Sequence, residues 1–219
     1  MDVKFSFFDL DHTLLRVNCS FHFGLYLHRK KLIGIRSICQ LFWYYFLHKC
    51  GRINIYEIHT KSFESLFRGA SKKDFEKYGD SFVEECFERL INYRVLAVLY
   101  DAQRRGRRVM ILSSSPEFLV KPIARKLGVT DVYSTIYQTN EAGMYHTIEK
   151  VLEGKEKAKI VKQILLSENI SDQDSAAYSD SHHDLLFLES VSVPIAVNPT
   201  KPLLKICRDR GWEVLRLEG

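Results

Sequence analysis

Helix-like and strand-like segments alternate through residues 94–219, and this alternation limits the folds open to the chain. The expected elements, in chain order, are a helix at 94–106, a strand at 107–112, a helix at 117–127 closed by Gly128, a hairpin region at 131–150, a helix at 156–167, a short strand before Asp180, a strand at 191–197 and a helix at 201–210. Helices that connect parallel strands cover both faces of their sheet. The sequence therefore predicts an α/β fold, with a Rossmann-like, mostly parallel sheet and helices on both faces.

The segment 16–93 breaks this alternation. It has almost no strand pattern, it contains no proline, and long helical patterns run through 55–67 and 72–90. It follows the first strand-like run and precedes the alternating region. We therefore expect a catalytic core made of residues 1–15 and 94–219, with residues 16–93 inserted as a helical cap domain.

Two carboxylates follow the first expected strand. Residues 3–8 form a short aromatic and β-branched run, and residues 9–13 read DLDHT, which places Asp9 and Asp11 at the strand's end. In open α/β sheets this is where ligands bind. Two carboxylates can face an anionic phosphate ester when a hard cation such as Mg²⁺ lies between them. One carboxylate can then attack phosphorus while the other transfers protons. The competing interpretation is an acidic surface turn.

Three later segments add groups suited to phosphate. Residues 113–116, with the sequence SSSP, offer hydroxyls and backbone N–H groups at a strand end, although such turns are often simple helix caps. The helix that starts near residue 154 carries Lys155 and Lys157, which can reach a phosphoryl group or lie on a solvated face. Asp180 and Asp184 follow a small-residue strand at a spacing suited to a metal and its waters.

In this order, the four motifs resemble those of the haloacid dehalogenase-like hydrolases, and most closely their phosphoserine-phosphatase-like branch, subfamily IB. The likeness runs from Phe5 to Trp212 and includes the segments 115–124, 126–129 and 196–199. It implies a haloacid dehalogenase-like core with an inserted helical cap. It also implies a magnesium-dependent phosphomonoester hydrolase that acts through an aspartyl-phosphate intermediate.

The resemblance assigns roles to individual residues. It implies Asp9 as the nucleophile, Asp11 as the general acid and base, Thr13 as a hydroxyl that supports the loop, Ser113 and Ser114 as phosphate-binding residues, and Lys157 as the phosphate-binding lysine, with Lys155 as the second choice. It implies a Mg²⁺ site formed by Asp9, the backbone carbonyl of Asp11 and Asp180, supported by Asp184. His12 and Asn18 are expected substrate contacts, and His12 and Ser179 stand where the family commonly has smaller residues.

Phosphoserine is disfavoured as the substrate. By this alignment Asn18 stands where phosphoserine phosphatases have an acidic residue, and their cap arginine falls near Phe63. An unpaired ammonium or carboxylate would cost about 1–3 kcal/mol or more per group. We therefore expect a different small phosphorylated metabolite. The alternatives are a phospholipid head-group phosphate, as in phosphatidylglycerophosphatases, transfer of the phosphoryl group to an acceptor alcohol, and, remotely, a non-catalytic phosphate-binding protein.

Residues 32–47 are unusually apolar and have basic flanks. The segment is too short and too interrupted to span a bilayer, but Trp43 and its neighbouring tyrosines suit an interfacial helix that contacts phospholipid. The competing interpretation is a cap helix buried against its neighbours or against the partner in a homodimer. A formal net charge of +5 fits either anionic lipids or anionic substrates. The basic residues do not interleave with aromatics in a nucleic-acid-binding module, so no nucleic acid is expected.

Composition indicates an ordinary globular protein. The 219 residues are 46% hydrophobic and 27% charged, which excludes a disordered chain. The cysteines are odd in number and lack C-x-x-C spacing, so we expect buried reduced thiols rather than disulfides or zinc ligands at Cys19, Cys39, Cys50, Cys86 and Cys207. The first strand is expected to begin at about the third residue, so no signal peptide is expected before it. We expect a cytoplasmic location, with membrane association as the alternative.

Overall fold

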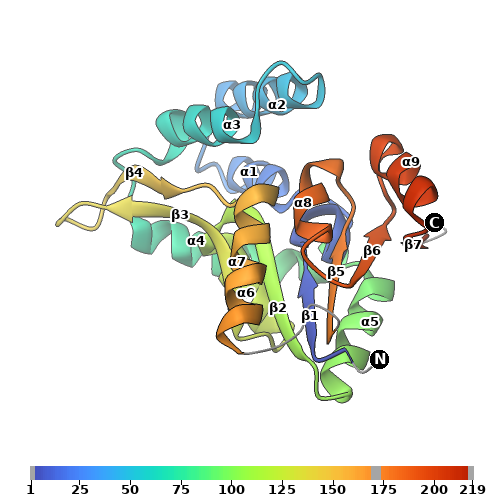
Figure 1. The fold of residues 1–219 in the computed structure, drawn as a ribbon. Coiled ribbons are helices and arrows are strands. Elements are labelled where there is room, and N and C mark those ends of the chain that lie inside the picture. The colour runs from blue at the N-terminus through green and yellow to red at the C-terminus, as the bar shows by residue number, and fades with distance from the viewer. Residues whose placement is uncertain (1–2, 169–173, 217–219) are drawn as a thin grey trace.

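The computed structural model describes residues 3–168 and 174–216 and contains a central twisted sheet (Figure 1). The strands are β1 (Phe5–Phe8), β2 (Arg108–Pro116), β3 (Asp131–Thr139), β4 (Tyr145–Lys150), β5 (Ser175–Ser179), β6 (Val193–Val197) and β7 (Glu213–Leu215). They form a seven-stranded sheet in the order β4-β3-β2-β1-β5-β6-β7. Only the β3–β4 pair is antiparallel. The short aromatic strand β1 therefore lies in the centre, between β2 and β5.

Helices pack on both faces of this sheet. The core helices are α5 (Tyr93–Arg104), α6 (Glu117–Lys126), α7 (Gly154–Ser167), α8 (Leu185–Leu188) and α9 (Lys201–Arg210). Alternate residues of β1 point to opposite faces, because side chains alternate along a strand. Phe7 packs with Ile160 of α7 and Phe187 of α8, whereas Phe8 belongs to the cluster that includes Leu99 of α5. The predicted α/β fold class is confirmed.

Several element boundaries differ from the predicted ones. The strand expected at 107–112 continues to Pro116, and its register against β3 is irregular between Leu112 and Pro116. The three serines therefore lie within the last residues of the strand and not after it. The helical pattern at 55–67 divides into α3 (Ile55–Ser62) and a wider turn at Phe63–Phe67. The three-residue edge strand β7 was not predicted, because its pattern is too short to stand out.

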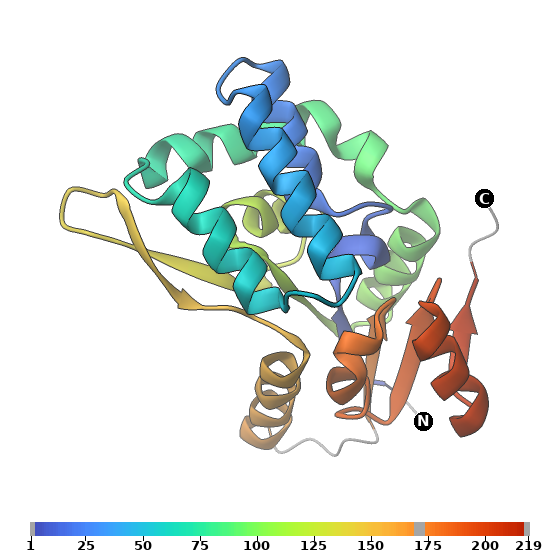
Figure 2. The ribbon, with the colours of Figure 1, turned by 90° about the horizontal axis from the view of Figure 1, so that it is seen from above.

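The inserted segment is helical. It consists of α1 (Cys19–Arg29), α2 (Ile35–Lys49), α3, the turn at Phe63–Phe67 and α4 (Lys72–Leu90). Its two ends meet, since Leu15 bridges Ile91 and the Asn92 amide donates to the Leu14 carbonyl at 2.9 Å. Figure 1 shows α2 and α3 on the side of the molecule toward which the parallel strands run, and the view from above in Figure 2 shows these two helices in front of the sheet. The limits 16–93 for a separate cap domain remain a prediction, because cap and core share one hydrophobic cluster.

That shared cluster depends on one glycine. A Cβ atom at Gly79 of α4 would lie 2.2 Å from the carbonyl oxygen of Phe118 in α6. Only a residue without a side chain allows the two helices to approach this closely. The ring of Phe23 in α1 lies 5.5 Å from that of Phe82 in α4, edge to face, and 5.6 Å from that of Phe118, in a tilted arrangement (distances between ring centroids). The cap is therefore fixed to the core by close aromatic packing.

The apolar cap helix α2 carries an exposed apolar stripe. Large exposed side chains recur on its outer face at helical spacing, and we call Ile35, Cys39, Phe42, Trp43 and Phe46 the outer stripe of α2. Trp43 is 55% exposed and Phe42 is 56% exposed, so this face of the helix is not buried against the described cap helices, one of the interpretations left open by the sequence. No helix in the described part of the chain is long and apolar enough to cross a membrane.

The cysteines are free thiols. Cys19, Cys86 and Cys207 are buried, as expected, whereas Cys39 and Cys50 are exposed. The expectation of burial was wrong for these last two, because Cys39 belongs to the outer stripe of α2 and Cys50 directly follows the last residue of that helix.

Candidate active site

A large cleft opens where the strands β1, β2 and β5 end. It has a volume of about 1120 Å³ and is lined from the core by Asp9, Asp11 and Asp180 and from the cap by residues of α1, α2 and α3. Parallel strands deliver their carboxyl ends to one edge, which explains why segments far apart in the sequence meet there. We call the group Asp9, Asp11, Lys157, Asp180 and Asp184 the catalytic edge.

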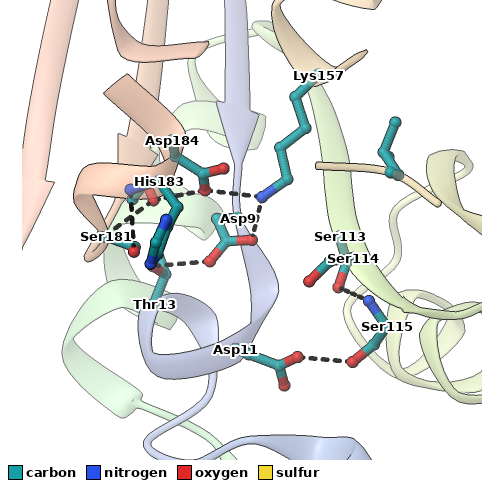
Figure 3. Close-up of polar contacts among 12 residues, drawn as sticks. Asp9, Asp11, Thr13, Ser113, Ser114, Ser115, Lys157, Ser181, His183 and Asp184 are labelled. Carbon is teal, nitrogen blue, oxygen red and sulfur yellow. Dashed lines mark hydrogen bonds and ion pairs between the residues drawn. The ribbon is translucent and has the colours of Figure 1, made fainter. Parts of the chain in front are cut away.

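Asp9 lies at the centre of the catalytic edge (Figure 3). Its amide continues the β1–β5 ladder by donating to the Tyr178 carbonyl at 2.9 Å, so its position is set by the sheet. Its carboxylate accepts a hydrogen bond from Lys157 Nζ at 2.7 Å and a longer one from Thr13 Oγ1 at 3.4 Å. Burial raises the pKa of Asp9 to about 7, against the opposing effect of Lys157 and with a further contribution from Asp184.

A tight turn brings Asp11 back toward the same cleft. His12 has a φ of 59°, in the left-handed region, and the Leu15 amide donates to the Leu10 carbonyl at 2.9 Å. Asn92 braces the turn by donating from Nδ2 to the Thr13 carbonyl at 3.2 Å. His12 lines the cleft, as does Asp11. The two predicted catalytic aspartates are thus brought together by backbone geometry.

Lys157 is a buried cation between two carboxylates. Its Nζ lies 2.7 Å from Asp9 Oδ1 and 2.7 Å from Asp184 Oδ2, and Ser179 Oγ donates to that same Asp184 oxygen at 2.8 Å. Burial lowers the pKa of Lys157, but Asp184 and Asp9 outweigh this effect, so the pKa is raised overall. The lysine therefore stays charged at neutral pH.

A glycine lets Lys157 reach this position. A Cβ atom at Gly154 would lie 2.1 Å from the His183 carbonyl oxygen, so the start of α7 can press against the loop that carries Asp184 only without a side chain there. Lys157 follows one turn later on the same helix and points toward Asp9 and Asp184. The glycine was visible in the sequence, but the contact that requires it was not.

Asp180 adds a fourth carboxylate to those of Asp9, Asp11 and Asp184. It follows β5 and lines the cleft, and its pKa is raised to about 8 by burial, followed by the charges of Asp9 and Asp184. The catalytic edge thus holds one lysine and four carboxyl groups, and this excess of acidic groups suits a cation bound by oxygen ligands. In the described residues, no three His, Cys, Asp or Glu side chains are arranged as a metal-binding group. The implied Mg²⁺ site combines two carboxylates with a backbone carbonyl, and the chemistry of that donor set fits the ion.

Comparison with known proteins decides the family. Residues 6–189 match the model of the haloacid dehalogenase-like hydrolases. The chain belongs to the haloacid dehalogenase-like hydrolases. The predicted family and the prediction of a phosphatase-class enzyme are confirmed.

Relatives of the hydrolase span nearly its whole length. A phosphoserine phosphatase from Mycobacterium tuberculosis is 27% identical over 217 residues, covering 95% of this chain and 69% of the relative. A histidinol-phosphatase from Neisseria meningitidis is 27% identical over 217 residues, covering 96% of this chain and 97% of the relative. A crystal structure of a protein of unknown function from Bordetella pertussis has the same fold, with a TM-score of 0.84, 24% identity and coverage of 98% of this chain and 99% of that one.

The serine motif of the hydrolase is arranged differently from the expectation. Ser113 is fully buried and its Oγ accepts from the Ser115 amide at 3.1 Å, whereas Ser114 and Ser115 line the cleft. Ser115 Oγ donates to Asp11 Oδ2 at 2.6 Å. Sequence reasoning named Ser113 and Ser114 and missed Ser115. The run of three serines was the available signal, but it could not show which hydroxyl faces the aspartate.

Cap residues complete the wall of the cleft. Asn18, an expected substrate contact, lines the cleft but also caps α1 by accepting from the Phe21 amide at 2.9 Å. His59 of α3 was not predicted, and its Nδ1 lies 3.0 Å from the Tyr137 hydroxyl. Burial lowers the pKa of His59 to about 4, so the ring is neutral and Nδ1 can accept from the tyrosine. This contact joins the cap to strand β3 inside the hydrolase's cleft.

Proposed function

We propose that the protein is a magnesium-dependent phosphomonoester hydrolase that acts through an aspartyl-phosphate on Asp9. The observation that carries the proposal is the placement of Asp9 and Asp11 at the end of β1, with the Lys157 cation 2.7 Å from Asp9. A carboxylate at this position can attack phosphorus, and the neighbouring lysine can hold the phosphoryl oxygens as charge develops on them.

The reaction runs in two steps. In the first, an oxygen of Asp9 forms a bond to phosphorus, the bond to the ester oxygen breaks with its electron pair, and Asp11 gives that oxygen a proton. In the second, a water gives its proton to Asp11 and attacks phosphorus, which breaks the bond to Asp9 and releases inorganic phosphate. Asp11 ends the cycle protonated and Asp9 ends it as a carboxylate. Ser114, at the edge of the cleft, supports phosphate binding beside Lys157.

Magnesium would be held by Asp9, Asp180 and the backbone carbonyl of Asp11, with Asp184 in support. When bound, it would balance the charge between these carboxylates and the phosphate dianion. The raised pKa values of Asp9 and Asp180, to about 7 and about 8, support a site that needs such a charge. Lys157 and Ser179 meanwhile hold Asp184 in place.

The substrate we propose is a small phosphorylated metabolite other than phosphoserine. Asn18 carries no charge, and its oxygen is already used to cap α1. Phe63 is 1% exposed, packs against Tyr137 and offers nothing to a carboxylate. These two residues support the view that the amino-acid ends of phosphoserine would lack partners in the cleft. The two relatives are named for different substrates, phosphoserine and histidinol phosphate, so their names do not single out one substrate for this protein.

A screen for released phosphate tests the proposal. The purified protein with Mg²⁺ is offered a panel of soluble phosphomonoesters and phospholipid head-group phosphates, with acceptor alcohols present and absent. Release of inorganic phosphate supports the hydrolase, and appearance of a new ester with an added alcohol supports the phosphotransferase. If no ester of the panel is turned over and phosphate is merely bound, the non-catalytic alternative takes its place.

A phospholipid head-group phosphate is the second candidate substrate. The exposed outer stripe of α2 favours it, because Phe42 and Trp43 can insert among lipid head groups while Arg36 on the same helix attracts anionic lipid. The same stripe fits a homodimer interface. The cytoplasmic location, with or without membrane association through residues 32–47, is part of this proposal and is tested by cell fractionation.

A further inference from the structure

Both carboxylate oxygens of Asp11 are held by donors from the chain. Oδ1 accepts from the Cys19 amide at 2.6 Å, and Oδ2 accepts from the Ser115 hydroxyl at 2.6 Å. Cys19 is the first residue of α1, so its amide is among those that a helix leaves without a backbone partner. The two donors come from the cap and from the end of β2. Asp11 is therefore fixed from two directions.

Ser115 is itself fixed. It is 3% exposed, its Oγ accepts from Cys19 Sγ at 3.3 Å, and it lies 2.9 Å from the hydroxyl of Ser20. Its amide donates to Ser113 Oγ at 3.1 Å, which holds the backbone on the other side. A hydroxyl has one proton and two lone pairs. When Ser115 donates its proton in the hydrogen bond to Asp11, its lone pairs can accept from Cys19 Sγ and Ser20 Oγ. The side chain is thus kept in the orientation that donates to Asp11.

We propose that Ser115 is a positioning residue that aims the proton-transferring carboxyl group of Asp11, an inference that rests on the proposed function. Fixing Oδ2 fixes the plane of the carboxyl group, so that Asp11 meets the ester oxygen at the moment when the bond from that oxygen to phosphorus breaks. Small errors in such placement are costly to catalysis. Ser115 forms no bond to phosphorus and neither gains nor loses a proton in either step.

The test compares two leaving groups in wild type and S115A, both loaded with Mg²⁺. An alkoxide needs a proton to leave, whereas p-nitrophenolate is a stable anion and does not. Ser115→Ala is therefore expected to lower kcat/KM by about 10- to 100-fold for the best alkyl phosphate found in the screen, and by less than about threefold for p-nitrophenyl phosphate. The ratio kcat/KM is used because it covers the steps up to formation of the aspartyl-phosphate.

A double-mutant cycle separates positioning from packing. If Ser115 acts through Asp11, adding Ser115→Ala to Asp11→Asn changes the residual kcat/KM for the alkyl phosphate by less than about twofold. Ser115→Thr keeps the hydroxyl and is expected to restore the alkyl-ester rate. If S115A does not fold, Ser115→Cys replaces it, because a thiol is a weak donor of similar size and should give the same selective loss.

Ser6→Ala is the matched control. Ser6 is also buried, and in the described residues its hydroxyl has no hydrogen-bond partner, so its loss should leave both rates unchanged. An equal loss with both esters in a folded S115A, or a full effect of Ser115→Ala in the Asp11→Asn protein, overturns the positioning role while wild-type turnover still supports the proposed function. If the wild type releases no phosphate from any ester, the proposed function itself is wrong.

Discussion

The catalytic edge and the outer stripe of α2 both reverse the usual distribution of polar and apolar side chains, but they differ in how many contacts hold their side chains. At the catalytic edge, charged groups are buried and every one of Asp9, Asp11, Lys157 and Asp184 has a short contact with another part of the protein. On α2, large apolar groups face outward and are left exposed by the residues that the structure describes. The groups of the first region are therefore held in place by contacts within the fold, whereas the outer stripe of α2 is exposed in the described part of the chain.

Removing the nucleophile should have the largest effect on activity. Asp9→Asn keeps the size of the side chain but cannot form the aspartyl-phosphate, so turnover should fall by about 10⁴-fold or more. Thermal unfolding should remain cooperative, since loss of a buried negative charge beside Asp184 offsets loss of the bond from Lys157. Wild-type protein should also be trapped by beryllium fluoride, which mimics the phosphorylated aspartate. Appreciable turnover by Asp9→Asn would exclude Asp9 as the nucleophile.

Removing the metal should have the second largest effect on activity. EDTA, or Asp180→Ala, is expected to reduce phosphate release by about 100-fold or more, because the phosphate dianion then faces the carboxylates with only Lys157 to balance them. Asp184→Ala should cost less, about 10- to 100-fold, as expected for a supporting group. Magnesium titrations of the rate, with calorimetry of Mg²⁺ binding to each variant, measure both effects. An unchanged wild-type rate in EDTA would rule out the magnesium mechanism.

A smaller effect should follow from crowding the start of α7. Gly154→Ala places a Cβ atom 2.1 Å from the His183 carbonyl oxygen, so the helix must shift and carry Lys157 away from Asp9. We expect a loss of about 1–3 kcal/mol in the free energy of unfolding, together with a lower kcat. Gly34→Ala is the control, because a Cβ atom there meets nothing within 4 Å. If the two variants unfold at the same denaturant concentration, the close contact is not needed.

The outer stripe of α2 should matter least for a soluble substrate. Changing Phe42 and Trp43 to serine removes exposed apolar area without touching the catalytic edge, so hydrolysis of a small ester should stay within about twofold of wild type. If α2 is an interfacial helix, the same change weakens salt-sensitive co-sedimentation with anionic liposomes. If wild type instead forms a dimer that this variant loses, and liposomes retain neither protein, the stripe is a subunit interface.

These two regions also differ in how far the sequence predicted them. Asp9, Asp11 and Asp180 were found because each follows a short apolar strand, and parallel strands end at one edge. The contact of Ser115 with Asp11 could not be predicted, because the sequence does not show which of three successive serine side chains points to the aspartate, and the irregular end of β2 sets their directions. In α2, apolar residues occur on nearly every side of the helix, so periodicity could not tell which face packs on the cap and which meets solvent.

The central position of β1 bears on how the chain folds. Phe5 pairs with Arg108 on one side and with Ser175 on the other, so both partners of the first strand lie beyond the whole cap segment in the sequence. Contacts between residues far apart in sequence slow folding. Until β2 or β5 pairs with it, the Phe5–Phe8 strand has no neighbour on either edge. We expect refolding from denaturant to compete with association through this strand, and higher protein concentrations to lower the yield of active enzyme.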